Sequence, residues 1–203
     1  MTSVTAIQFQ SKGVTCRGDL YLPDTAGRAP IMVMAHGLGG TRNMRLPAFA
    51  ERFVAEGYGC LLFDYRHFGD SDGEPRQLLD IKKQLQDWKA AIEHARGLAQ
   101  VDPDRVILWG TSFSGGHVLA TAADDPRIAA VISQCPFTDG LASTLATEPL
   151  VSAKLTAKAL RDRLGALVGA APVMVAVAGR PGDTALMTAP DVWDGYMNLV
   201  PEG

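Results

Sequence analysis

The feature that most restricts the fold of this chain is a series of short, continuous apolar runs. They occupy residues 31–35, 59–63, 106–109 and 128–133, and segments with helical character lie between them. Residues 80–100 form the clearest such segment, because apolar side chains recur there every three or four positions. Strands of a parallel sheet have this continuous apolar pattern when helices bury both faces of the sheet. The chain is therefore predicted to be an α/β protein with a mostly parallel sheet.

The two ends of the chain add to this prediction. Residues 5–10 and 14–22 predict an antiparallel pair of strands joined by a turn at residues 11–13. Residues 141–167 are rich in Ala, Leu, Lys and Arg and predict helix, whereas residues 172–178 predict another strand. No linker-like or low-complexity stretch divides the 203 residues, and their 47% hydrophobic and 20% charged composition is that of a globular protein.

Charge and composition exclude several classes of function. A net charge of -3 with scattered Lys and Arg argues against nucleic acid as a partner. The N-terminus lacks the pattern of a signal peptide, so a cytoplasmic location is expected. The longest uncharged run, residues 164–179, is shorter than the roughly 20 residues that span a bilayer, so no membrane association is expected. The 3 cysteines lie far apart without metal-ligand spacing, and we expect reduced thiols and no metal site.

The sequence Gly-Thr-Ser-Phe-Ser-Gly-Gly at residues 110–116 is the strongest chemical motif. It lies between a predicted strand and a predicted helix, which is where a nucleophile elbow belongs. A serine on such a turn projects its hydroxyl above the sheet, and the helix N-terminus that follows favours developing negative charge. Ser112 is therefore the predicted nucleophile, with Ser114 where the pattern has glycine. The alternative is a Ser/Gly-rich helix cap with no chemistry.

A second motif, His-Gly-Leu-Gly-Gly at residues 36–40, directly follows the predicted strand 31–35. This is where a hydrolase of this architecture places its second oxyanion donor. We expect the backbone N–H groups of Leu38 and Phe113 to face the oxyanion of a tetrahedral intermediate. The alternatives are a simple turn or a phosphate loop. The glycine spacing fits neither of the common phosphate-binding patterns, because position 42 is arginine and no Gly-Lys-Ser/Thr follows.

These motifs, together with Asp-Tyr-Arg-His-Phe-Gly-Asp-Ser-Asp-Gly at residues 64–73, resemble the α/β-hydrolase superfamily in type and in order. Within it, the chain is similar to bacterial hydrolases related to X-Pro dipeptidyl-peptidase and cocaine esterase, and more distantly to dienelactone hydrolases. The resemblance implies a serine hydrolase that cleaves an ester, thioester or activated amide of a small-molecule acyl substrate through acyl-Ser112, with no cofactor. In the 64–73 loop, His67 replaces a glycine of the family pattern, and Arg66 and Asp70 are expected to brace loops.

The remaining members of a catalytic triad are not identified by the sequence. In this fold the acid and then the histidine follow the nucleophile, and the only later histidine, His117, lies on the helix that Ser112 begins. Asp139 and Asp183 are both candidates for the acid. The resemblance implies that residues 1–140 form the hydrolase core, that residues 141–203 are largely cap, and that the histidine lies beyond residue 203. The alternative is a catalytically inert scaffold for ligand binding or protein contact, and the substrate and oligomeric state stay open.

Overall fold

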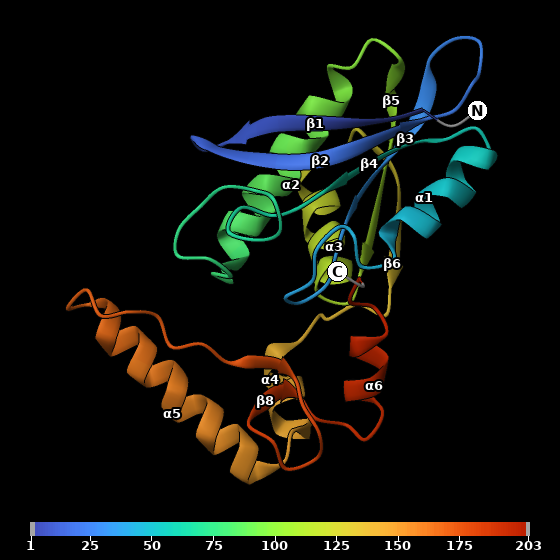
Figure 1. Ribbon diagram of the computed structural model, residues 1–203. Coiled ribbons are helices and arrows are strands. Elements are labelled where there is room, and N and C mark those ends of the chain that lie inside the picture. The colour runs from blue at the N-terminus through green and yellow to red at the C-terminus, as the bar shows by residue number, and fades with distance from the viewer. Residues whose placement is uncertain (1–2, 202–203) are drawn as a thin grey trace. The chain divides into compact units, whose positions relative to one another are not determined.

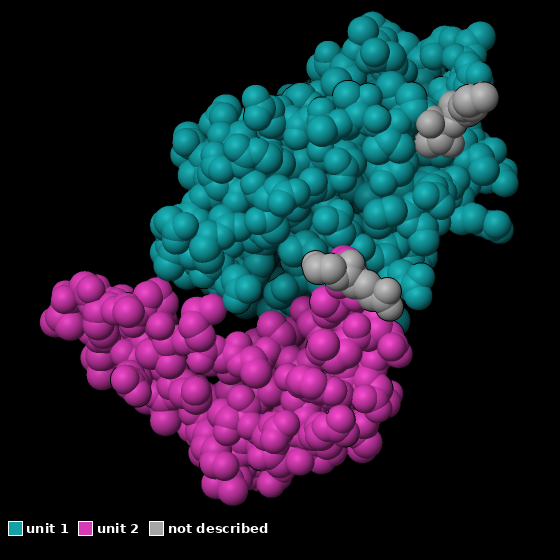
Figure 2. Space-filling model, in the orientation of Figure 1, with its two compact units in different colours: residues 1–138 teal, residues 139–203 magenta. Residues whose placement is uncertain are grey.

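The structure, a computed structural model, describes residues 3–201 of the chain. Two compact units divide it, residues 1–138 and residues 139–203 (Figure 2). Each unit is described by itself below. No helix within residues 3–201 combines the length and the hydropathy that a membrane crossing requires.

The first unit is built on a six-stranded sheet with the order β1-β2-β4-β3-β5-β6 (Figure 1). The N-terminal hairpin pairs antiparallel, and β2 also pairs antiparallel with β4, whereas β4, β3, β5 and β6 run parallel. The mostly parallel α/β sheet with antiparallel N-terminal strands is thus confirmed. The strands are β1 (Ser3–Ser11), β2 (Val14–Leu22), β3 (Ala29–Ala35), β4 (Gly59–Phe63), β5 (Val101–Thr111) and β6 (Ile128–Gln134).

Three helices cover the two faces of this sheet: α1 (Leu46–Ala55), α2 (Ile81–Arg96) and α3 (Phe113–Asp124). Side chains alternate along each parallel strand, so that Val33 belongs to one core and Met34 to the other. The core beside α2 and α3 is centred on Trp88, and α1 packs on the opposite face through Leu46 and Val54. Because both faces of β3, β4 and β5 are covered, these strands carry the continuous apolar runs that predicted them. The edge strand β6 has the same kind of run, although residues such as Ile132 are exposed there.

The second unit holds α4 (Gly140–Ala146), α5 (Pro149–Ala166), the short parallel strands β7 (Ala176–Ala178) and β8 (Ala185–Met187), and α6 (Val192–Met197). Only a few of its apolar side chains are buried, among them Val151, Ala178 and Ala185. Many leucines along α4 and α5 are exposed, including Leu145 and Leu164.

Two sequence expectations differ from the observed elements. The sequence Asp-Pro-Asp-Arg at residues 102–105 predicts a turn ahead of the strand at 106–109, but it lies inside β5, because Val101 already pairs with Ala29 of β3. At this segment the pairing of β5 with β3 is irregular, and the Asp104 N–H donates to the Asp102 side chain (3.1 Å), as in a turn. The strand expected at residues 172–178 is limited to its last three residues, which pair with β8.

Candidate active site

Three loops meet at the carboxyl edge of the parallel strands. Ala35 at the end of β3 pairs with Phe63 at the end of β4 and with Gly110 near the end of β5. The segments that follow these residues are the three motifs found in the sequence. The register of the sheet therefore brings together the 36–40 loop, the 64–73 loop and Ser112, although these segments are far apart along the chain.

Ser112 occupies a strained turn between β5 and α3. Its backbone angles are φ 55° and ψ -115°, a conformation that costs on the order of 1–3 kcal/mol for a residue with a side chain. Two hydrogen bonds hold it there: the Ser112 N–H donates to the carbonyl of Gln134 (2.9 Å), and the Phe137 N–H donates to the carbonyl of Ser112 (2.8 Å). The segment that ends β6 thus fixes the peptide groups on both sides of Ser112.

The Ser112 hydroxyl does not cap the helix. Ser112 stands at the N-cap position of α3, yet its side chain makes no capping hydrogen bond. A capping serine normally has extended backbone angles, with its hydroxyl accepting from the second or third N–H of the helix. The helix-cap alternative therefore lacks the bond that it requires, and Ser112 is itself partly exposed.

Gly110 shows why the elbow needs a small residue two positions before the serine. A Cβ on Gly110 would lie 2.3 Å from the carbonyl oxygen of Ser114, which is backbone and cannot give way. The strand and the helix approach each other too closely here for any side chain. This is the steric reason that the motif predicted.

The 36–40 loop lies directly against Ser112. A Cβ on Gly37 would come within 3.0 Å of the Ser112 Cβ and 3.4 Å of its Oγ. The loop then turns, with the Gly40 N–H donating to the carbonyl of Gly37 (3.3 Å). Leu38, the next residue after Gly37, is partly exposed, and Phe113, the next after Ser112, opens the first turn of α3. The N–H groups of a first helical turn have no acceptor within the helix.

Arg42 and Asp64 form a buried charged network beneath these loops, and of its members only Asp70 was expected to brace a loop. Asp64 accepts from the Arg42 N–H (2.7 Å) and from its guanidinium. The same guanidinium donates to Asp19 of β2 (2.7 Å) and to Asp70 (2.8 Å). Asp64 is fully buried, so its charge requires such a partner. The network ties the 36–40 loop region to the 64–73 loop, and no short sequence signal marks it.

Arg66 also braces a loop, as expected. Its guanidinium donates to the buried Asp87 of α2 (2.7 Å) and to the Ser11 hydroxyl (2.7 Å). His67, which follows it, has a positive φ of 73°, a conformation in which the glycine of the family pattern is unstrained.

A match to a known protein family shows where this chain belongs. Residues 12–166 match the family described as X-Pro dipeptidyl-peptidase (S15 family). The chain belongs to this α/β-hydrolase family.

Several named proteins and solved structures that are similar to this chain are longer than it. The "Quorum-quenching protein AidA" of Acinetobacter baumannii is 64% identical over 197 residues, which cover 97% of this chain and 65% of that protein. The "Thiohydrolase aneE" of Aspergillus aculeatus is 40% identical over 125 residues, which cover 62% of this chain and 39% of that protein. Among solved structures, the α/β hydrolase GrgF from Penicillium sp. superposes with a TM-score of 0.76 at 31% identity, covering 89% of this chain and 61% of that one. The chain thus spans about two fifths to two thirds of their lengths.

A serine nucleophile needs a base, and the chain's 4 histidines all lie in the first unit. His117 is on α3, where its Nε2 lies 2.8 Å from the Oε1 of Gln84 on α2. Burial lowers the pKa of His117 to about 4, so its ring is neutral near pH 7. Five positions along a helix from Ser112 also correspond to about 7.5 Å of rise. His117 joins two helices and is unsuited to accept the Ser112 proton.

The other three histidines have contacts of their own. The ring of His36 is buried 4.9 Å from the ring of Tyr65. His67 Nε2 lies 3.4 Å from Lys83 Nζ, and His94 stacks on a phenylalanine of β1. Burial lowers the pKa of all three rings, and Lys83 adds to the effect at His67. None of these contacts involves the Ser112 hydroxyl.

The two candidate acids have local structural roles. Asp139 caps α4, where its side chain accepts from the N–H groups of Leu141 (2.9 Å) and Ala142 (3.0 Å). Asp183 closes its own turn by accepting from the Arg180 N–H (2.8 Å). Both are exposed. Each acid is thereby accounted for without a catalytic partner, and the structure brings neither into hydrogen-bonding contact with a histidine.

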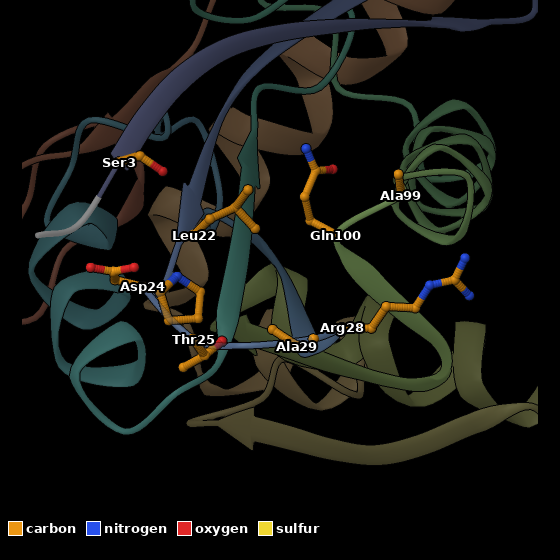
Figure 3. A pocket seen from close by; sticks show the side chains of 10 residues that line it. Ser3, Leu22, Asp24, Thr25, Arg28, Ala29, Ala99 and Gln100 are labelled. Carbon is orange, nitrogen blue, oxygen red and sulfur yellow. The ribbon is translucent and has the colours of Figure 1, made fainter.

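A surface depression of about 650 Å³ lies elsewhere, at the amino ends of the parallel strands. Ser3, Leu22, Arg28, Ala29 and Gln100 are among its lining residues (Figure 3). Ligands of α/β sheets bind outside the carboxyl ends of the strands, where Ser112 lies. The depression is therefore not the candidate active site.

Proposed function

We propose that this chain supplies the nucleophile of a serine hydrolase that cleaves a carboxylic ester, thioester or activated amide through an acyl-Ser112 intermediate. Ser112 Oγ attacks the acyl carbon, its proton passes to a base, and the leaving group departs protonated. Water then releases the acid and regenerates the serine. The substrate is a small molecule with an acyl group, and neither metal nor organic cofactor takes part.

One observation carries this proposal: Ser112 is held in a strained conformation at the strand-to-helix turn, with a hydroxyl that caps nothing. Strain of this kind persists only where surrounding contacts enforce it, and it gathers at functional sites. The bonds to Gln134 and Phe137 enforce it here. Membership of the hydrolase family, and a relative named as a thiohydrolase, support the acyl chemistry.

Backbone amides are proposed to stabilise the oxyanion. Phe113 begins a helix beside the serine, and Leu38 follows the glycine that touches it. Amides placed in this way donate to the negative oxygen of the tetrahedral intermediate, and the loss of one donor typically slows kcat by about 10²- to 10³-fold. The positive end of the α3 dipole acts in the same direction.

The base and the cap complete the proposal. Because no hydrogen bond joins a histidine to the Ser112 hydroxyl within residues 3–201, we propose that the base comes from a segment beyond residue 203, together with its acid. Residues 141–203 are proposed to be largely cap, which selects the acyl and leaving groups. We place the enzyme in the cytoplasm.

The test replaces Ser112 with alanine in the complete gene product that carries this chain. Hydrolysis of p-nitrophenyl acetate is expected to fall by at least about 10³-fold, because the nucleophile is lost while only oxyanion and binding effects survive. Ser3→Ala, at the opposite end of the sheet, is the matched control and keeps the wild-type rate (Figure 3). Unchanged turnover by the Ser112 variant would favour the inert-scaffold alternative or another nucleophile.

A further inference from the structure

Ser114 occupies the position at which the elbow pattern has glycine, and steric fit alone does not account for its environment. Its side chain is completely buried. Its hydroxyl donates to the carbonyl oxygen of His36, in the loop that lies against Ser112. A hydroxyl with no access to water is stable only when such bonds are made.

The bond to His36 is the last in a chain of three whose direction is fixed. The indole N–H of Trp88 can only donate, and it does so to the Tyr65 hydroxyl (2.7 Å). Ser114 has a single hydroxyl proton, which goes to His36, so Tyr65 must donate to Ser114. Burial raises the pKa of Tyr65, which therefore keeps its proton across the working pH range. Each hydroxyl accepts one bond and donates one.

This chain joins the elbow helix to the oxyanion loop. Ser114 lies in the first turn of α3, two residues after Ser112. The carbonyl of His36 belongs to the peptide that leads into Gly37, whose Cα faces the Ser112 side chain. A bond to that carbonyl restrains the peptide that enters Gly37, and thereby limits how far the backbone can shift at the next residue, Leu38. Trp88 anchors the other end in the rigid core, where it is fully buried on α2.

We infer that Ser114 is a positioning residue whose hydroxyl holds the 36–40 loop in register with Ser112, so that the Leu38 amide meets the oxyanion. The inference rests on the proposed function. Its consequence is specific: loss of the hydroxyl displaces a group that acts only in the transition state. Such a loss lowers kcat and leaves KM nearly unchanged.

The experiment compares Ser114→Ala and Ser114→Gly in the complete gene product, with p-nitrophenyl acetate as substrate. Both are expected to lower kcat by about 10- to 100-fold, since small misplacements of catalytic groups cost up to about 10²-fold, with KM within about threefold. Ser114→Gly restores the family pattern, so a purely steric role predicts wild-type kcat for it. The inactivation rate with a fluorophosphonate should fall in parallel with kcat.

Two further variants separate positioning from general destabilisation. Tyr65→Phe removes the donor to Ser114 but not the bond to His36, so it should lower kcat less than Ser114→Ala does. The double variant Tyr65→Phe/Ser114→Ala should have the same kcat as Ser114→Ala alone, because Tyr65 acts through Ser114. Thr121→Val, at another buried hydroxyl of α3 that has no partner within residues 3–201, is the matched control and keeps kcat.

Ser112→Ala in the same series distinguishes a failure of the proposed function from a failure of the positioning role of Ser114. If it retains turnover, the proposed function itself is wrong. If it is inactive while Ser114→Gly and Ser114→Ala match the wild-type kcat, the proposed function stands and the positioning role is overturned. Additive losses in the double variant would also overturn it.

Discussion

At the scale of single residues, the site depends on two close backbone approaches. Gly110 makes room for the carbonyl of Ser114, and Gly37 makes room for the side chain of Ser112. The sequence predicted the first, because the elbow pattern places a small residue there. It did not predict the second, because the contact of Gly37 with Ser112 depends on the register of β3 against β5.

We predict that Gly37→Ala lowers kcat by about 10- to 100-fold with little change in the melting temperature. The new methyl group would lie 3.0 Å from the Ser112 Cβ and 3.4 Å from its Oγ, so the serine or the loop must shift. Shifts of this size cost up to about 10²-fold in rate. Steady-state kinetics on the complete gene product measure the effect. Gly97→Ala is the control, since a methyl there meets only ordinary contacts at 3.4 Å; equal kcat values for the two variants would contradict the account.

At the scale of elements, α2 and α3 are joined on one face of the sheet by the buried pair of Gln84 and His117. Apolar periodicity predicted the helix and a buried stripe that starts at Ile81. Trp88, Ile92 and Ala95 of that stripe are buried, whereas Ile81, in the first turn, is exposed. Periodicity could not predict the contact between Gln84 and His117, because the sequence around a single histidine does not indicate which residue of another helix it contacts. The same limit applies to Arg42, whose partners come from two segments distant in the sequence: Asp19 from β2, and Asp64 and Asp70 from the 64–73 loop.

The His117 pair predicts a pH dependence of stability. The folded-state pKa of about 4 lies below the ordinary value of 6.5, so the folded protein disfavours the charged ring. The contribution of His117 is present above pH 6.5 and is lost as the pH falls toward 4. Between pH 7 and pH 5 the loss is about 2 kcal/mol. Urea denaturation at both pH values measures the effect. When the pH falls from 7 to 5, the unfolding free energy of His117→Gln should decrease by about 2 kcal/mol less than that of the wild type. Parallel pH profiles for variant and wild type would show that His117 is not held neutral.

At the scale of the whole molecule, the first unit holds the serine, both loops and every histidine of the chain. The order of the motifs along the sequence was enough to predict the fold, because each motif follows a strand of the parallel sheet. The triad partners could not be predicted in this way. A catalytic acid or base is defined by a contact. Asp139 and Asp183 resemble candidates in sequence, whereas in the structure Asp139 caps α4 and Asp183 closes its own turn.

We predict that none of the four histidines is the base. Single glutamine variants of His36, His67, His94 and His117 in the complete gene product should all keep serine-dependent turnover of p-nitrophenyl acetate. His36→Gln is expected to show the largest decrease, because its ring packs beside the oxyanion loop. A variant as inactive as Ser112→Ala would identify its histidine as the base and contradict the assignment of the base to a segment beyond residue 203.

The central claim is that Ser112 is the nucleophile, and covalent labelling tests it most directly. The complete gene product is treated with a fluorophosphonate probe, digested, and the modified residue is located by mass spectrometry. We predict that Ser112 alone is modified and that Ser112→Ala abolishes the labelling. Modification of Ser114 or of another residue, or undiminished labelling of the alanine variant, would contradict the claim.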